Sequence, residues 1–238
     1  MLHIQNLTKI YRGGKKNLKA VDNLSISVKP GKICGFIGQN GAGKTTTLKC
    51  IAGILDYSEG NIFIDGRNLK EEPLECKKVL SYVPDNPEIY ENLTGIQYLN
   101  FVGNIYQIEK GTRNWIMKEY ADIFELTGAL GSLISSYSRG MKQKIAIIGA
   151  LMHKPKLLLL DEPFVGLDPI ATHKLKEIMH SLCNHGSSIF FSTHVLEVAQ
   201  KLCDEMAIIK SGRLVITGET NQIIGNKSLE DLFLELVE

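Results

Sequence analysis

The stretch Gly38-Gln39-Asn40-Gly41-Ala42-Gly43-Lys44-Thr45 decides how this 238-residue chain folds. It fits the pattern G-x-x-x-x-G-K-[ST], whose backbone N–H groups surround the phosphates of a bound nucleotide. Lys44 is expected to reach the β- and γ-phosphates, and the Thr45 hydroxyl to ligate Mg²⁺. The residues expected to hold the nucleotide here are Gly38, Asn40, Gly41, Gly43, Lys44, Thr45 and Thr46.

The flanking sequence predicts the strand and the helix that such a loop needs. Residues 32–37 are apolar enough for a buried strand, and residues 45–51 predict the start of a helix. The helix would point the positive end of its dipole at the phosphates. The loop pattern alone occurs by chance in roughly one chain in a hundred of this length, and the flanking elements make a chance match rarer.

A second segment supplies carboxylates. Leu157 to Leu160 form a short apolar run, typical of a strand buried on both faces of a parallel sheet. Asp161 and Glu162 follow, where the carboxyl end of a central strand binds ligands in open α/β sheets. Asp161 is expected to hold Mg²⁺, directly or through water, and Glu162 to act as general base on the attacking water. The alternative is a surface acidic pair that caps the next helix.

A third segment, Tyr137-Ser138-Arg139-Gly140-Met141, precedes a helix expected over residues 141–152. Ser138 can donate a hydrogen bond, Gly140 allows close backbone approach, and a helix N-terminus favours an anion. Ser-x-Gly before a helix is also an ordinary N-cap, so this segment gains its meaning only from the others.

Together these segments, in this order, resemble the ATP-binding-cassette (ABC) ATPases over nearly the whole chain. The third segment is similar to the family's Leu-Ser-Gly-Gly-Gln signature: Ser138 and Gly140 match, whereas Tyr137, Arg139 and Met141 depart from it. The resemblance implies that this segment contacts the γ-phosphate of ATP held by a second subunit, through Ser138, Arg139, Gly140 and Met141.

Four further positions take roles from the same resemblance. His194, after a strand-like run, is similar to the family's switch histidine, which contacts the γ-phosphate; a lone histidine there is otherwise structural. Asp168 corresponds to the loop that couples two sites across a dimer. Tyr11 stands where an aromatic stacks on adenine, and its alternative role is to close the core. Asp85 occupies a slot where many members have a γ-phosphate-sensing glutamine, and its carboxylate could still bind water or Mg²⁺.

The implied site therefore has three parts, with ATP and Mg²⁺ as ligands. The catalytic residues are Glu162, His194 and Lys44. The metal residues are Thr45, Asp161 and Asp85. The remaining ATP contacts come from Tyr11, the phosphate loop and the signature of the other subunit.

Composition narrows the partners and the compartment. A net charge of +1 offers no basic stripe of the kind that nucleic-acid binders show, so no nucleic-acid partner is expected. The five cysteines are odd in number and none forms C-x-x-C, which favours a reducing cytosol over a disulfide scaffold or zinc site. No apolar run approaches the roughly 20 residues of a membrane span, so a membrane role needs a partner.

Hydrophobic patterning predicts one domain over residues 1–238, with a core (1–86 and 153–238) that contains a helical lobe (about 87–152). Alternating residues predict strands near the N-terminus, the stretch from about 94 to 152 is helical in pattern, and helix and strand alternate after residue 169. With the resemblance, the expected fold is an α/β P-loop NTPase (RecA-like) core with an antiparallel β subdomain and an inserted α-helical lobe.

The resemblance implies an ATPase subunit of an ABC transporter, and more loosely a bacterial exporter. Its partners would be a second ATPase subunit, bound head to tail, and an integral membrane subunit, which would keep the chain cytoplasmic and peripheral on the inner face of the membrane. Residues 85–106 are expected to dock on that subunit, with Tyr90 and Leu93 as apolar anchors.

The sequence leaves a second class of ABC ATPase open and disfavours other classes of nucleotide-binding protein. A soluble ABC ATPase of the Fe–S cluster assembly type has the same motifs. A chromosome-maintenance ATPase needs a long coiled coil between Lys44 and Ser138, where no sustained heptads occur. A GTPase needs Asn-Lys-x-Asp, which is absent, and measurable ATP turnover would dismiss a purely structural nucleotide binder.

Overall fold

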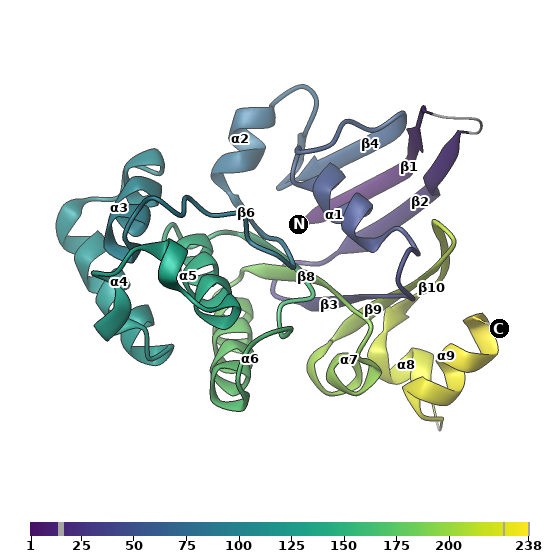
Figure 1. The fold of residues 1–238 in the computed structure, drawn as a ribbon. Helices are drawn as coiled ribbons and strands as arrows, with labels where there is room; N and C mark the ends of the chain where they lie inside the picture. The colour runs from purple at the N-terminus through teal and green to yellow at the C-terminus, as the bar shows by residue number, and fades with distance from the viewer. Residues whose placement is uncertain (14–16, 226, 238) are drawn as a thin grey trace.

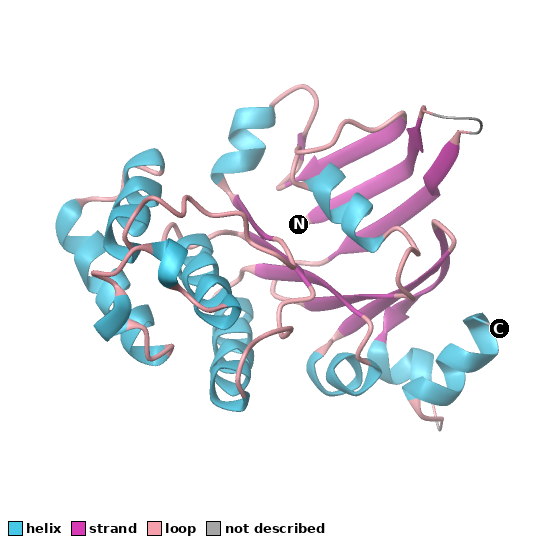
Figure 2. Ribbon diagram, in the orientation of Figure 1, coloured by secondary structure: helices cyan, strands magenta, loops and turns pink. Residues whose placement is uncertain are grey.

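The computed structural model describes residues 1–13, 17–225 and 227–237. Two β-sheets lie beside each other, with a group of helices at one side of the molecule (Figures 1 and 2). The first sheet is antiparallel in the order β2-β1-β4-β5, from Leu2–Tyr11 (β1), Leu18–Val28 (β2), Glu59–Ile64 (β4) and Arg67–Asn68 (β5).

The antiparallel sheet follows from simple alternation. Leu24, Ile26 and Val28 of β2 are buried while the residues between them are exposed, as expected for a sheet with one covered face. Leu2 of β1 pairs with Val28, and Ile4 pairs with Ile26. The covered face packs against the helix that follows the phosphate loop, so this sheet forms one wall beside that loop.

The second sheet has the order β10-β9-β3-β8-β7-β6. Its strands are Ile33–Ile37 (β3), Leu80–Val83 (β6), Leu157–Asp161 (β7), Ser188–Thr193 (β8), Glu205–Lys210 (β9) and Arg213–Glu219 (β10). All are parallel except β10. Every residue of β3, β7 and β8 is buried, which confirms the central strands predicted from continuous apolar runs.

This topology positions the site. The strands β3, β8 and β7 are neighbours in that order, and their carboxyl ends meet at one edge. The phosphate loop follows β3, Glu162 follows β7 and His194 follows β8, so three motifs that are far apart in the sequence converge there.

The core helices are Lys44–Ile51 (α1), Pro73–Lys78 (α2), Pro169–Asn184 (α6), Leu196–Leu202 (α7), Thr220–Ile224 (α8) and Leu229–Val237 (α9). The lobe between β6 and β7 contains Gly95–Ile105 (α3), Lys110–Ile123 (α4) and Arg139–Leu151 (α5), drawn at the left of Figure 1. The fold confirms the predicted α/β class, its antiparallel subdomain and its helical insertion.

Two details of the lobe correct the sequence-based expectations. Residues 124–138 are not α-helical: they form turns and two short 3₁₀ segments, Thr127–Ala129 and Ile134–Ser136. Gly128 and Gly131 disfavour a helix there, although nearby Leu126 and Ile134 are buried. The signature helix begins at Arg139 rather than 141, because the Ser138 hydroxyl accepts the N–H of Met141 and caps it. Within the described residues, no helix is both long and apolar enough to cross a membrane.

Candidate functional site

The phosphate loop is built around the Lys44 side chain, which is 6% exposed. Its Nζ donates to the carbonyl oxygens of Gly38 at 2.7 Å and Gln39 at 3.3 Å. Gly43 has φ 106°, and a Cβ on it would lie 2.5 Å from the Ala20 carbonyl oxygen. Only glycine fits this bend, which turns the chain from β3 into α1 and holds the ammonium inside the loop.

A cleft of about 340 Å³ lies beside the loop. It brings together the predicted adenine-stacking Tyr11, the predicted sensor Asp85 and the predicted base Glu162. The other lining residues are Leu18, Ala20, Gln39, Asn40, Gly41, Gly43, Lys44, Thr45 and Thr46. The Tyr11 ring is 39% exposed, its hydroxyl lies 3.5 Å from Thr46 Oγ1, and Lys9 Nζ lies 5.1 Å from its centroid. Tyr11 is thus accessible to a planar ligand.

Asp161 is the last residue of β7, directly before the cleft residue Glu162, and is 1% exposed. Its Oδ1 accepts a hydrogen bond from Ser192 Oγ at 2.5 Å, whereas its buried Oδ2 has no hydrogen-bond partner among the described residues. A buried carboxylate oxygen without a partner is costly, and a cation would satisfy it. Asp161 therefore fits the predicted metal role.

The predicted metal set is small, and the chemistry of Mg²⁺ explains why. Among the described residues, no three His, Cys, Asp or Glu side chains gather as a metal cluster. Mg²⁺ typically takes one or two carboxylates and completes its shell with waters and substrate phosphates. Thr45 and Asp85 line the cleft, and Asp161 is buried directly before the lining residue Glu162. Asp85 also pairs with Arg139 at 3.1 Å.

Glu162 lies between Lys44 and His194. Its Oε1 is 3.6 Å from Lys44 Nζ and its Oε2 is 2.9 Å from His194 Nδ1. The backbone adopts φ 47°, a left-handed conformation that a glutamate rarely takes, and its N–H donates to Ser192 Oγ and to the Ser192 carbonyl oxygen. Such strain persists where surrounding contacts fix it, often at functional sites. Within the part of the chain that the structure describes, the Oε1 atom is buried without a hydrogen bond, so it can accept one.

The three predicted catalytic residues are thus in one cluster. Sequence reasoning missed Ser192, which fixes the Glu162 member of this cluster. Ser192 bonds both Asp161 and Glu162 from the neighbouring strand β8. Its only signal in the sequence was its place two residues before His194.

None of the signature residues lines the cleft, although Arg139 pairs with the lining residue Asp85. Gly140 packs on the loop after β7: a Cβ there would lie 2.6 Å from the Gly166 carbonyl oxygen. Asp168 caps α6 by accepting the N–H of Ala171 at 2.8 Å, and it pairs with Lys144 of α5 at 2.7 Å. These two contacts lower the pKa of Asp168. The signature and the predicted coupling loop are therefore in direct contact.

Comparisons with known proteins agree with this geometry. Residues 21–165 match the family model described as ABC transporter. The chain is 33% identical over 243 residues to the ABC-type transporter ATP-binding protein EcsA of Bacillus subtilis (strain 168), covering 100% of this chain and 97% of that one. It is 35% identical to the linearmycin resistance ATP-binding protein LnrL of the same organism, over 92% of this chain and 69% of that one.

Solved structures give the same result. The structure of an ATP-binding subunit of an ABC transporter superimposes with a TM-score of 0.93 at 32% identity, over 99% of both chains. A dimeric ATP-binding cassette in a post-hydrolysis state, bound to ADP and Pi, superimposes with a TM-score of 0.85 at 23% identity, over 92% of this chain and 99% of that one. At 23% identity, this second similarity establishes a shared fold.

Proposed function

The chain belongs to the ABC transporter family and is its ATP-hydrolysing, ATP-binding component, and we propose that two copies close on two ATP molecules to drive a membrane export subunit. The observation that carries the proposal is the cluster of Lys44, Glu162 and His194 at the edge of the parallel sheet, beside a cleft lined by the phosphate loop. In this proposal the chain is a single ATPase domain over residues 1–238, and residues 87–152 form the helical lobe that is inserted into its core.

ATP would bind with its triphosphate in the phosphate loop and its base against Tyr11. Lys44 would leave the loop carbonyls to reach the β- and γ-phosphates, a charge-assisted contact. Thr45 and Asp161 would hold Mg²⁺, with Asp85 as a further candidate, and the ion would offset the charge on those phosphates. The buried, unpartnered Oδ2 of Asp161 supports this assignment.

Glu162 would act as the general base. The Oε1 atom has no hydrogen bond and faces Lys44, so it can accept a proton from water that attacks the γ-phosphate. His194 holds Oε2 and so fixes the direction of the carboxylate. The left-handed backbone of Glu162 aims the side chain into this position.

The signature would act on the ATP of the second copy. Ser138 is an exposed N-cap, and the N-terminus of the 13-residue helix α5 begins there without an acidic residue in its first turn. Because the signature does not line its own cleft, an arrangement with C₂ symmetry would bring it to the partner's phosphates. The dimeric form of the structurally similar cassette supports this arrangement. ATP that contacts both copies favours the closed dimer.

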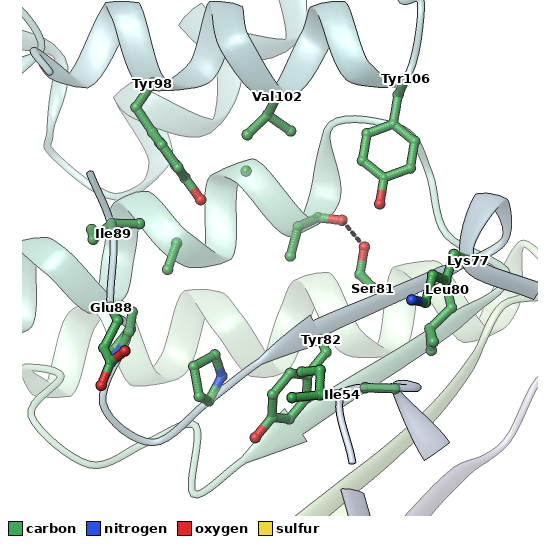
Figure 3. A pocket seen from close by; sticks show the side chains of 16 residues that line it. Ile54, Lys77, Leu80, Ser81, Tyr82, Glu88, Ile89, Tyr98, Val102 and Tyr106 are labelled. Atoms are coloured by element: carbon green, nitrogen blue, oxygen red, sulfur yellow. Dashed lines mark hydrogen bonds between the residues drawn. The ribbon is translucent and has the colours of Figure 1, made fainter. Parts of the chain in front are cut away.

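Residues 85–106 would dock on the membrane subunit. They border a pocket of about 380 Å³ between lobe and core, where Figure 3 shows Tyr98, Val102 and Tyr106 across from Ser81 and Tyr82.

Large apolar side chains near this pocket supply the anchors. Tyr90 is 59% exposed and packs edge-on to Phe101, with ring centroids 5.3 Å apart. Leu93 is only partly exposed. Exposed aromatic residues beside a pocket are typical anchors of an interface, so Tyr90 is the stronger of the two proposed anchors.

The direction of transport rests on the relatives. LnrL is named for resistance to linearmycin, and resistance fits the removal of a compound from the cell. We therefore favour an exporter, with the chain in the cytoplasm at the inner face of the membrane and with no nucleic-acid partner.

Co-expression tests the membrane partner. The chain should sediment with membranes when its membrane subunit is co-expressed and remain in the supernatant when it is expressed alone. Tyr90→Ala should lose the sedimentation but keep basal ATP turnover, whereas Trp115→Ala, which removes an exposed aromatic outside residues 85–106, should keep both. If the chain turns over ATP but never sediments with any membrane subunit, the soluble ABC ATPase is the better assignment.

A further inference from the structure

Two side chains that depart from the pattern of the family pair with each other. Arg139 replaces the first glycine of the signature, and Asp85 replaces the sensor glutamine; Arg139 Nη2 lies 3.1 Å from Asp85 Oδ1. Asp85 follows β6 of the core and lines the nucleotide cleft, whereas Arg139 begins α5 of the lobe. The ion pair therefore joins the chain's own cleft to the surface that is meant for the partner's ATP.

The local electrostatics explain why Arg139 needs a negatively charged partner. A cation at the first position of a helix lies at the positive end of the helix dipole, which disfavours it. Helix α5 carries no acidic residue in its first turn. Its three cations are instead paired with carboxylates from elsewhere in the chain: Arg139 with Asp85, Lys142 with Glu91, and Lys144 with Asp168. The N-terminus of α5 thus has an excess of positive charge that outside anions neutralise.

The Asp85–Arg139 pair is also easy to break. The two side chains are 47% and 56% exposed, and ion pairs at such positions contribute little net stability. A guanidinium binds phosphate with the same paired N–H groups that it offers to a carboxylate. An arriving phosphate could therefore replace Asp85 at little cost.

We propose that Asp85 and the γ-phosphate of the partner's ATP compete for Arg139. In the open chain Arg139 is bridged to Asp85, and on closure it transfers to the phosphate. The proposal rests on the head-to-tail dimer of the proposed function. Because Asp85 lines the cleft of its own chain, the exchange also links the two nucleotide sites: the cation released from one cleft contributes to the other.

A purely structural bridge predicts a different result. The Arg139 stem lies 3.7 Å from the place of a Cβ on Gly166, so the pair could simply hold α5 in position. Loss of either partner would then weaken closure. In the exchange, loss of Asp85 strengthens closure, because Arg139 no longer has to leave a carboxylate, whereas loss of Arg139 weakens it.

The experiment measures the ATP concentration for half-maximal dimer formation, by light scattering, in full-length Glu162→Gln protein that retains ATP. Asp85→Asn should lower this concentration by about 2- to 5-fold, and Arg139→Ala should raise it by about 10-fold or more. Asp85→Asn also alters the binding of ATP and Mg²⁺ in its own cleft, so it is repeated with Ala at position 139. The gain from Asp85→Asn should be at least about 2-fold larger with Arg139 present.

The control and the contrary results separate the possibilities. Asp65→Asn breaks the Lys156–Asp65 pair, which is similarly exposed and lies outside the cleft, and it should leave dimer formation unchanged. A gain from Asp85→Asn that is equal in both backgrounds, or a loss with Arg139 present, would overturn the exchange while leaving the dimer intact. If the Glu162→Gln protein without further substitutions stays monomeric in ATP, the proposed dimer is overturned as well.

Discussion

At the scale of single residues, the site depends on how β7 ends. Asp161 is the last residue of the strand and Glu162 turns into a left-handed conformation, so two consecutive carboxylates take different directions. One is buried against Ser192, and the other faces Lys44 and His194. This division fits a metal-binding role for the first and a proton-accepting role for the second.

Ser192 is expected to support both carboxylates. Ser192→Ala removes the donor to Asp161 Oδ1 and one acceptor for the Glu162 N–H. The loss leaves buried polar groups less satisfied, so the free energy of unfolding should fall by about 1–3 kcal/mol, and kcat should fall more than the affinity for ATP. Denaturant unfolding and steady-state turnover measure the two effects. Wild-type kcat in a destabilised variant would show that Ser192 is only structural.

At the scale of elements, sequence patterns predicted what is local and missed what is not. The phosphate loop, the strand expected over 157–160 and the strand before His194 each carry their own pattern and end signals, so the sequence predicts them. The Asp85–Arg139 pair joins residues 54 positions apart, and Ser192 meets Asp161 over 31 positions. No local pattern encodes such contacts, because they arise only when the strands take their order in the sheet.

The N-cap of the signature helix separates stability from function. Ser138→Ala removes the cap of α5, and Thr94→Ala removes the capping box of α3. Each should cost about 0.5–2 kcal/mol of unfolding free energy. Only Ser138→Ala should also weaken ATP-dependent dimer formation in the Glu162→Gln background, since only Ser138 belongs to the signature. Equal effects of the two variants on dimer formation would remove Ser138 from the proposed ATP contacts.

A partly buried histidine directly after the lobe should make stability depend on pH. His153 stacks on Tyr106, with ring centroids 3.6 Å apart, and burial lowers its pKa to about 4. An unfolded histidine binds a proton near pH 6.5, so below that pH the unfolded state holds more protons and stability falls until about pH 4.

His153→Phe keeps the stack and removes the titration. Relative to this variant, the wild type should lose on the order of 1–3 kcal/mol of unfolding free energy between pH 6.5 and pH 4. Urea unfolding at several pH values provides the comparison. Parallel pH profiles for the two proteins would mean that His153 is not held neutral by the fold.

At the scale of the whole molecule, the lobe and the core are joined at the nucleotide. Helix α5 of the lobe pairs with Asp85 at the sensor position through Arg139, and with Asp168 of the coupling loop through Lys144. The residues that line the cleft all belong to the core. In the proposed head-to-tail dimer, each chain would present two different surfaces to ATP, its phosphate loop and its signature. Each complete site would then need one surface from each copy.

The Glu162→Gln variant tests this account most directly, by sizing chromatography and ATP turnover on the same sample. The amide cannot accept the proton of water but can still lie beside His194, so ATP should bind and stay. The variant should elute as a dimer in ATP and as a monomer in ADP, with turnover lowered by about 100-fold or more. Glu177→Gln, on the exposed face of α6, should behave as wild type. Turnover above about a tenth of wild type, or a monomer in saturating ATP, would contradict the account.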